Sequence, residues 1–168
     1  MLRLTKKADY GLMALKYLAE QAEAVGSGQL AHSASASAKA IADAYHIPPQ
    51  LLAKILQTLT RGGILVSTAG TNGGYSLARP AAEINAFEVI RAIDGPLFIT
   101  SCVTDSGSCD LTDSCTIKEP LARVNDSISD VLKKIRISDL VESDHIHNHS
   151  RATQELVKIQ TKAQPQTA

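Results

Sequence analysis

Two short helical patterns, separated by a pair of prolines, constrain the fold of this chain more than any other feature. Ser37 is placed to cap the first helix, which is predicted over residues 38–45. Pro48 and Pro49 predict a turn and the first position of a second helix, where the missing proline N–H costs no hydrogen bond. The second helix is predicted over residues 50–61, and its apolar side chains share one face: Leu51, Leu52, Ile55, Leu56 and Leu59.

A β-hairpin is predicted directly after the second helix. Gly62 and Gly63 stop the helix, because glycine is the residue that most often ends one. Two strand-like runs, residues 64–67 and 75–77, then flank a glycine-rich turn at residues 69–74. A helix–turn–helix followed by a hairpin is typical of a winged helix-turn-helix.

An amphipathic helix is predicted to precede this unit, from Leu4 to about Gln21. Residues 22–37 are rich in Ala, Ser and Gly, so we interpret them as a flexible connection with a short strand near Gln29. The fold class predicted is therefore mainly α with a small β-hairpin, a winged helix-turn-helix plus a long dimerisation helix.

The charge pattern favours a polyanion as partner of the first half. Residues 1–80 hold eight Lys and Arg against four Asp and Glu, a net charge of +4, whereas residues 81–168 hold nine against thirteen, a net of −4. We therefore predict that residues 49–61 form a recognition helix in the major groove of double-stranded DNA. The candidate DNA contacts are Lys6, Lys39, Gln50, Lys54, Gln57, Thr58, Arg61, Thr68, Thr71 and Asn72. The alternative is a helical hairpin that is packed for structure only.

The second half begins with another amphipathic helix, predicted over residues 85–94 and ended by Gly95-Pro96. A long helix over residues 118–135 carries apolar side chains spaced three, four, three and four residues apart. This period of 3.5 indicates pairing with another helix, and beside a DNA-binding unit it favours a two-fold homodimer. The apolar positions are Leu121, Val124, Ile128, Val131 and Ile135.

The chain is thus divided into four predicted segments. Residues 1–80 form the DNA-binding domain, 81–117 a connecting helix and cysteine loop, 118–140 the dimerisation helix, and 141–168 a disordered polar tail. His145, His147 and His149 alternate in that tail, and we interpret them as solvated rather than metal-binding.

Three cysteines lie within fourteen residues, at Cys102, Cys109 and Cys115. An odd number cannot pair fully, so a disulfide framework is a poor interpretation. Six residues separate the first pair and five the second, wider than the usual zinc knuckles. The spacing alone leaves an iron–sulfur cluster, a zinc site and a thiol redox switch open, beside three unrelated surface cysteines.

Other classes are excluded on simple grounds. The chain has no apolar run of the roughly 20 residues that a membrane span needs. No apolar signal core follows Lys6 and Lys7, so we expect a cytoplasmic protein without a membrane partner. Because no nucleotide fingerprint or catalytic triad motif is present, we expect no enzyme.

Four segments together resemble the Rrf-type bacterial regulators: the opening LRLTKKADYGLMAL, the hairpin ILVSTAGTNGGYSLARP, the helix FEVIRAIDGP and the cysteine loop that follows. This family includes regulators of Isc and Suf iron–sulfur assembly and a nitric-oxide-sensing repressor. The start and the loop resemble the Suf branch most closely. The resemblance covers residues 1 to about 140.

The resemblance implies a dimeric transcription factor, usually a repressor, with Cys102, Cys109 and Cys115 as ligands of a [2Fe–2S] or [4Fe–4S] cluster. Relatives of the Isc type carry a His where this chain has Lys118. The nitric-oxide-sensing type instead uses an Asp of the first helix across the dimer, and Asp9 matches that position, with Glu119 as a second candidate. Without that role, Asp9 is a first-turn acid favoured by the helix dipole.

The wing departs from the family pattern. Members commonly carry an Arg before the first glycine of the hairpin turn, where this chain has Ala69. No Lys or Arg occurs between Arg61 and Arg79. We therefore expect the recognition helix to supply most of the sequence specificity.

Overall fold

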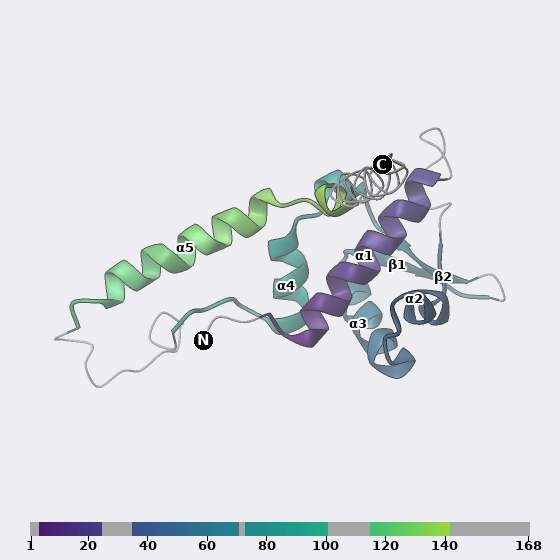
Figure 1. Cartoon of the computed structure of the whole chain (residues 1–168), viewed down its shortest axis with the longest axis horizontal. Coiled ribbons are helices and arrows are strands. Elements are labelled where there is room, and N and C mark those ends of the chain that lie inside the picture. The colour runs from purple at the N-terminus through teal and green to yellow at the C-terminus, as the bar shows by residue number, and fades with distance from the viewer. Residues whose placement is uncertain (1–3, 25–34, 71–72, 101–114, 142–168) are drawn as a thin grey trace, which may run out of the picture.

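The computed structural model describes residues 4–24, 35–70, 73–100 and 115–141. Helices α1 to α4 and a two-stranded hairpin form a head, from which α5 extends as a long arm (Figure 1). The mainly helical winged-helix class predicted from the sequence is confirmed. The elements are α1 (Lys6–Ala24), α2 (Ala38–Tyr45), α3 (Pro49–Arg61), β1 (Leu65–Thr68), β2 (Gly74–Leu77), the 3₁₀ turn η2 (Ala81–Glu83), α4 (Ala86–Asp94) and α5 (Lys118–Lys134).

The two helices of the helix-turn-helix form for the local reasons that the sequence indicated. The Ser37 side chain accepts a hydrogen bond of 3.1 Å from the Ala40 N–H and caps α2. His46 ends α2 in the left-handed conformation, with φ of 53°. Pro49 then stands in the first turn of α3, and Gly62 follows its last residue.

The hairpin is antiparallel, and its register pairs Leu65 with Leu77 and Ser67 with Tyr75. Tyr75 also bonds to a third segment, since its N–H donates to the Ala36 carbonyl at 2.8 Å and its carbonyl accepts from the Ala36 N–H at 3.0 Å. The predicted flexible connection over residues 22–37 is therefore wrong at both ends. Residues 22–24 continue α1, and Ala36 pairs with β2; the strand predicted near Gln29 lies outside the described residues.

One hydrophobic core joins the head to the segment after residue 80. Buried side chains from α1, α2, α3 and the hairpin pack in the same cluster as Ile84, Val89, Ile137 and Val141. Backbone hydrogen bonds of 2.9 Å from Ala86 N–H to Ile135 C=O and from Ile137 N–H to Ile84 C=O fix the returning chain beside the start of α4. The head thus shares its core with the C-terminal half.

The long helix is shorter than predicted. It ends at Lys134, and Ile135 is extended, with φ of −77° and ψ of 116°. Residues 137–141 form a further helical turn, whose Ile137 and Val141 are buried in the head. The burial of these two side chains draws the chain back to the core. The helix predicted over residues 118–135 therefore ends one residue early, and the segment predicted as one helix over 118–140 is broken at Ile135.

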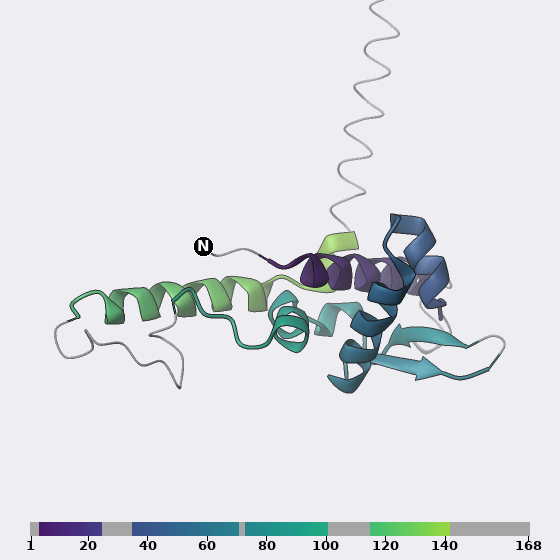
Figure 2. The same ribbon diagram turned by 90° about the horizontal axis from the view of Figure 1, so that it is seen from below.

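The segment after α4 runs beside α5 in both ribbon views (Figures 1 and 2). The Ile99 N–H donates to the Asn125 side-chain oxygen at 3.1 Å, which fixes this segment to the middle of α5. Within the ranges that the structure describes, no helix has the length and apolarity to cross a membrane.

Gly74→Ala is expected to lower the free energy of unfolding by about 1–3 kcal/mol. The added Cβ would lie 2.6 Å from the Ala36 carbonyl oxygen, so the bridge between Ala36 and β2 has to open. Urea denaturation followed by circular dichroism, at one protein concentration, measures the loss. Val66→Thr, at a side chain that is 40% exposed on the paired strand, is the control and should change stability by less than about 0.5 kcal/mol. Equal stability of the Gly74→Ala variant and the unmodified protein would contradict this packing.

Candidate nucleic-acid interface

Helix α3 presents a polar stripe to solvent. Gln50, Lys54, Gln57 and Arg61 are all exposed, and their spacing of four, three and four residues places them on one helical face. The opposite face is buried in the core through Leu52, Ile55, Leu56 and Leu59. Thr58 lies on the same helix. The fold thus brings together on α3 five of the ten DNA contacts that were predicted from the sequence.

Hydrogen bonds within α3 limit two of these side chains. The Thr58 hydroxyl donates to the Lys54 carbonyl at 3.0 Å and accepts from the Arg61 guanidinium at 3.5 Å. The Arg61 Nε also donates to the Gln57 carbonyl, at 3.4 Å. Gln50, Lys54 and the Gln57 amide are therefore the side chains of this stripe that extend most freely toward a ligand.

The other predicted contacts lie on different elements. Lys6 begins α1, and Lys39 lies in the first turn of α2; both are exposed. Thr68 ends β1 and is exposed opposite Gly74. Thr71 and Asn72 lie outside the described residues.

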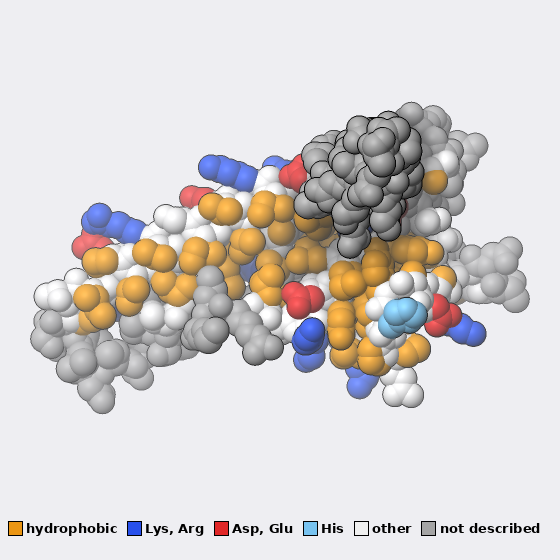
Figure 3. Space-filling view, in the orientation of Figure 1, with side chains coloured by type: hydrophobic (Ala, Val, Ile, Leu, Met, Phe, Trp, Pro, Cys, Tyr) orange, Lys and Arg blue, Asp and Glu red, His pale blue; other side chains and the backbone are white. Residues whose placement is uncertain are grey.

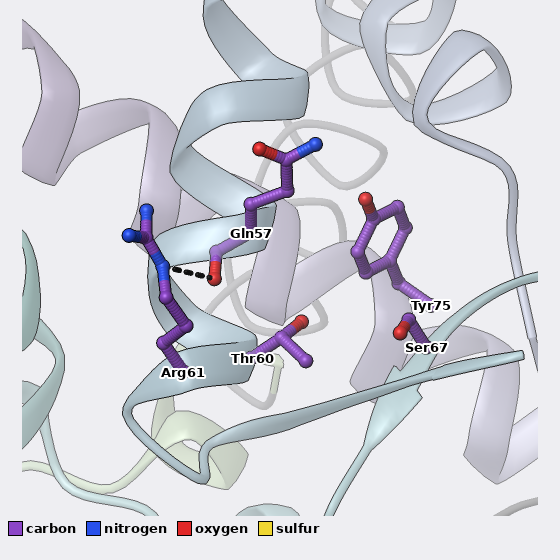
Figure 4. A pocket seen from close by; sticks show the side chains of 5 residues that line it. All are labelled: Gln57, Thr60, Arg61, Ser67 and Tyr75. Carbon is purple, nitrogen blue, oxygen red and sulfur yellow. Dashed lines mark hydrogen bonds between the residues drawn. The ribbon is translucent and has the colours of Figure 1, made fainter.

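A hollow of about 310 Å³, lined by side chains that all carry a polar group, lies between α3 and the hairpin (Figure 4). Its lining residues are Gln57, Thr60, Arg61, Ser67 and Tyr75. The sequence analysis missed Thr60, Ser67 and Tyr75. The alternation of side chains along a strand could have found the last two, because Ser67 and Tyr75 lie two residues from the buried Leu65 and Leu77 and share their face.

The first cation after the hairpin has a structural role. The Arg79 guanidinium donates to the Gly63 carbonyl at 3.3 Å and forms an ion pair with Glu88. Glu88 in turn belongs to the capping box of α4, in which it bonds to the Asn85 N–H at 2.7 Å. Arg79 therefore joins the end of the wing to α4 and leaves the wing without a free cation in its described part.

The predicted metal ligands are placed only in part. Cys115 is a free, half-buried thiol just before α5, whereas Cys102 and Cys109 lie outside the described residues. Asp9 is half-buried in the first turn of α1, and the exposed Glu119 forms an ion pair with Arg123. Among the residues described, no three His, Cys, Asp or Glu side chains are grouped closely enough to hold a metal ion.

Helix α5 exposes an apolar face to solvent. The Val124 and Val131 side chains are 48% and 56% exposed, and a hollow of about 310 Å³ lies along the same face. Figure 3 shows hydrophobic side chains following α5 along its length. The residues lining the hollow are Val124, Ser127, Ile128, Val131 and Leu132.

Comparison with known proteins identifies relatives of the whole described chain. The sequence profile of the Rrf2 family, described as an iron-dependent transcriptional regulator, matches residues 4–143. Protein aau3 of Rhizobium meliloti (strain 1021) is 33% identical over 164 residues, which are 96% of this chain and 99% of that protein.

Two solved structures illustrate the similarity of fold. CymR (YrzC), the global cysteine regulator of B. subtilis, has a TM-score of 0.64 and 26% identity, and the match covers 85% of this chain and 98% of CymR. IscR of T. potens also has a TM-score of 0.64, with 24% identity, over 85% of this chain and 88% of IscR.

Gln50→Ala is expected to relax base preference, because a glutamine amide can pair bidentately with adenine in the major groove. The cost on the preferred duplex should be about 1–3 kcal/mol, with little effect on mixed-sequence DNA. Lys39→Ala is the matched comparison and should weaken all duplexes alike, lowering the slope of log K against log salt by about one unit for each lost phosphate contact. Fluorescence anisotropy across a salt series measures both. Unchanged base preference in the Gln50→Ala variant would remove this residue from the interface.

Proposed function

The chain belongs to the Rrf2 family and is therefore a DNA-binding transcriptional regulator rather than an enzyme; on this premise we propose that it is a cytoplasmic, homodimeric repressor that senses iron–sulfur status. A [2Fe–2S] or [4Fe–4S] cluster on the cysteine loop is the proposed sensor, and Suf-type iron–sulfur assembly genes are the proposed targets. The observation that carries the DNA-binding part is the exposed polar stripe of α3 beside the hairpin.

The unusual burial pattern of α5 supports the homodimer. Its buried residues within the chain are the polar Asn125 and Ser129, while apolar side chains such as Val131 face solvent. A helix that packs only against its own chain normally buries its apolar side chains and exposes its polar ones. A second copy of α5 on this face would bury the exposed seam, and the two-fold axis would present two identical α3 helices to an imperfectly palindromic operator.

The flanks of the cysteine loop support a common ligand site. Ile99 is fixed to Asn125 in the middle of α5, and Cys102 follows it after only two residues, a reach of roughly 10 Å. Cys115 lies three residues before the first residue of α5. The cysteine-bearing segment is therefore flanked by Ile99, which bonds to α5, and by Cys115, which lies just before α5, and its sulfur donors suit iron–sulfur chemistry.

The residues of this chain connect such a site to the DNA-binding head. When bound, a cluster would supply a centre whose presence depends on iron, sulfur and oxidants. The loop leaves α4 immediately after Asp94, and both carboxylate oxygens of Asp94 accept hydrogen bonds from the Thr5 hydroxyl, at 2.7 and 2.9 Å. Thr5 also caps α1, since its hydroxyl accepts from the Ala8 N–H at 3.2 Å. A displacement of the loop would thus act on α1 and on the head packed against it.

The resemblance to CymR favours a second candidate function. CymR is described as a global cysteine regulator, and the S. aureus protein, 26% identical to this chain, has been solved in an oxidized form. A cluster-free regulator that senses oxidants through Cys102, Cys109 and Cys115 is therefore one alternative. A zinc-bound regulator is the other.

Anaerobically purified protein is expected to be brown and to show sulfide-to-iron charge-transfer absorption in the visible region. Cys115→Ala should abolish this absorption, because it removes one thiolate ligand. Ser114→Ala changes the neighbouring loop residue without removing sulfur and should retain the spectrum. A colourless protein with stoichiometric zinc after anaerobic reconstitution would overturn the cluster, and a colourless, metal-free protein whose DNA affinity falls on oxidation would establish the thiol switch.

The same spectra test the fourth ligand. Asp9→Ala is expected to preserve the thermal stability of the head and to make the cluster more labile to oxygen, provided that Asp9 ligates iron across the dimer. An unchanged spectrum and oxidation rate would reject Asp9 in favour of Glu119, another thiol or solvent.

Val131→Glu is expected to convert the dimer into monomers at micromolar concentration. A carboxylate in the apolar seam would have to be buried unpaired against the second copy of α5, which costs several kcal/mol. Sedimentation velocity measures the outcome, and Asp126→Asn, at an exposed position of the same helix, should remain dimeric. A Val131→Glu variant that sediments as a dimer would place the dimer contact elsewhere.

A further inference from the structure

We propose that the hollow between α3 and the hairpin holds a backbone phosphate of the DNA, and that the Tyr75 and Ser67 hydroxyls are its neutral donors. This inference rests on the DNA-binding orientation given above, in which α3 enters the major groove. It assigns a role to side chains of the wing that carry no charge.

The location of the hollow determines the part of the DNA that can reach it. When α3 lies in a major groove and the hairpin reaches toward the adjacent minor groove, a sugar–phosphate strand separates the two. That strand has to pass between α3 and the hairpin, which is where the hollow of about 310 Å³ lies. In Figure 4, Gln57 and Tyr75 stand on the two sides, from α3 and from β2, and Thr60 and Ser67 lie below them.

The backbone fixes Tyr75 firmly in this position. Its N–H and C=O both bond to Ala36, and β1 pairs with it through Ser67. Gly74, directly before it, leaves no room for a Cβ against the Ala36 backbone. A tyrosine whose backbone is held by two neighbouring segments loses little backbone entropy when it binds, so a single hydrogen bond from its hydroxyl contributes effectively.

Several side chains that line the hollow have hydrogen-bond donors that the described residues of the protein do not themselves use. The side chains of Gln57, Ser67 and Tyr75 form no hydrogen bond within the described part of the chain, so their donors are free for a ligand. Thr60 differs, because its hydroxyl already donates to the Leu56 carbonyl at 2.9 Å.

A phosphate matches this set of groups. Phosphate oxygens only accept hydrogen bonds, and hydroxyl and amide donors commonly contact them. Arg61 adds a positive charge at the rim, and none of the five lining residues is acidic. A base edge would need a fixed pattern of donors and acceptors, which rotatable hydroxyls supply poorly.

The test uses the full-length protein and a duplex selected from a random pool with that protein. Tyr75→Phe removes one hydroxyl from each protomer and should weaken binding about tenfold for each half-site, roughly a hundredfold for the dimer, on every duplex, the effect expected for one hydrogen bond to a charged group in each half-site. Because the tyrosine is neutral, the salt slope should stay unchanged, whereas Arg61→Gln should lower the slope by about one unit per contact. Tyr10→Phe, a half-buried tyrosine on α1, is the matched control and should bind as the unmodified protein does.

Methylphosphonate substitution, one position at a time along the selected duplex, then identifies the phosphate. At one position on each half-site, the neutral linkage should lower the DNA affinity of the unmodified protein. The Tyr75→Phe variant should bind this substituted duplex as strongly as it binds the unsubstituted duplex. Ser67→Ala should show the same loss at the same position, which keeps the test valid should Tyr75→Phe perturb the hairpin. Altered base preference, or unchanged affinity in both variants, would overturn the proposal. Failure to select any duplex would instead contradict DNA binding by this chain.

Discussion

The contact between α1 and α4 is the one on which the rest of the structure depends. Ile93 of α4 lies over Gly11 of α1 so closely that a Cβ on the glycine would stand 2.3 Å from the Ile93 Cδ1 atom. At the end of the same contact, the Thr5 hydroxyl bonds to the Asp94 carboxylate. This carboxylate lies at the C-terminus of its own helix, where the helix dipole disfavours negative charge, and at the N-terminus of α1, where the dipole favours it. The two helix ends therefore stabilise each other.

The position of α4 explains how one hydrophobic core can join the head both to α5 and to the segment that leads to the cysteines. Its N-terminus is held by the chain that returns from α5, through the bonds of Ala86 and Ile137, and its C-terminus is held by α1. The segment that leads to the cysteines starts directly after it and is fixed to α5 through Asn125. A change in the cysteine loop or in the proposed dimer contact would thus reach the head through hydrogen-bonded elements rather than through a flexible linker.

Local signals in the sequence were sufficient for part of the fold. The cap at Ser37, the proline at position 49 and the capping box of α4 act within a few residues, and the helices that they begin are confirmed. The bridge between Ala36 and Tyr75 and the end of α5 at Lys134 depend instead on contacts between distant segments, which no local pattern reports. For the same reason the stripe on α3 could be predicted from helical spacing, whereas the hollow beside it required the relative positions of α3 and the hairpin.

The distribution of charge in the head bears on how it would respond to a sensor. Coulomb attraction between a lysine and DNA falls off over a Debye length of roughly 8 Å, so a small rotation of the head changes it little. A hydroxyl–phosphate hydrogen bond weakens steeply beyond about 3 Å and at poor angles. In this chain Arg79 is tied to Gly63 and Glu88, and the described wing offers the hydroxyls of Ser67 and Tyr75 in place of a free cation. A wing that binds through such short-range contacts would make the affinity of the proposed dimer depend on the angle between its two heads, and α4 and α5 are the elements through which we propose that this angle changes.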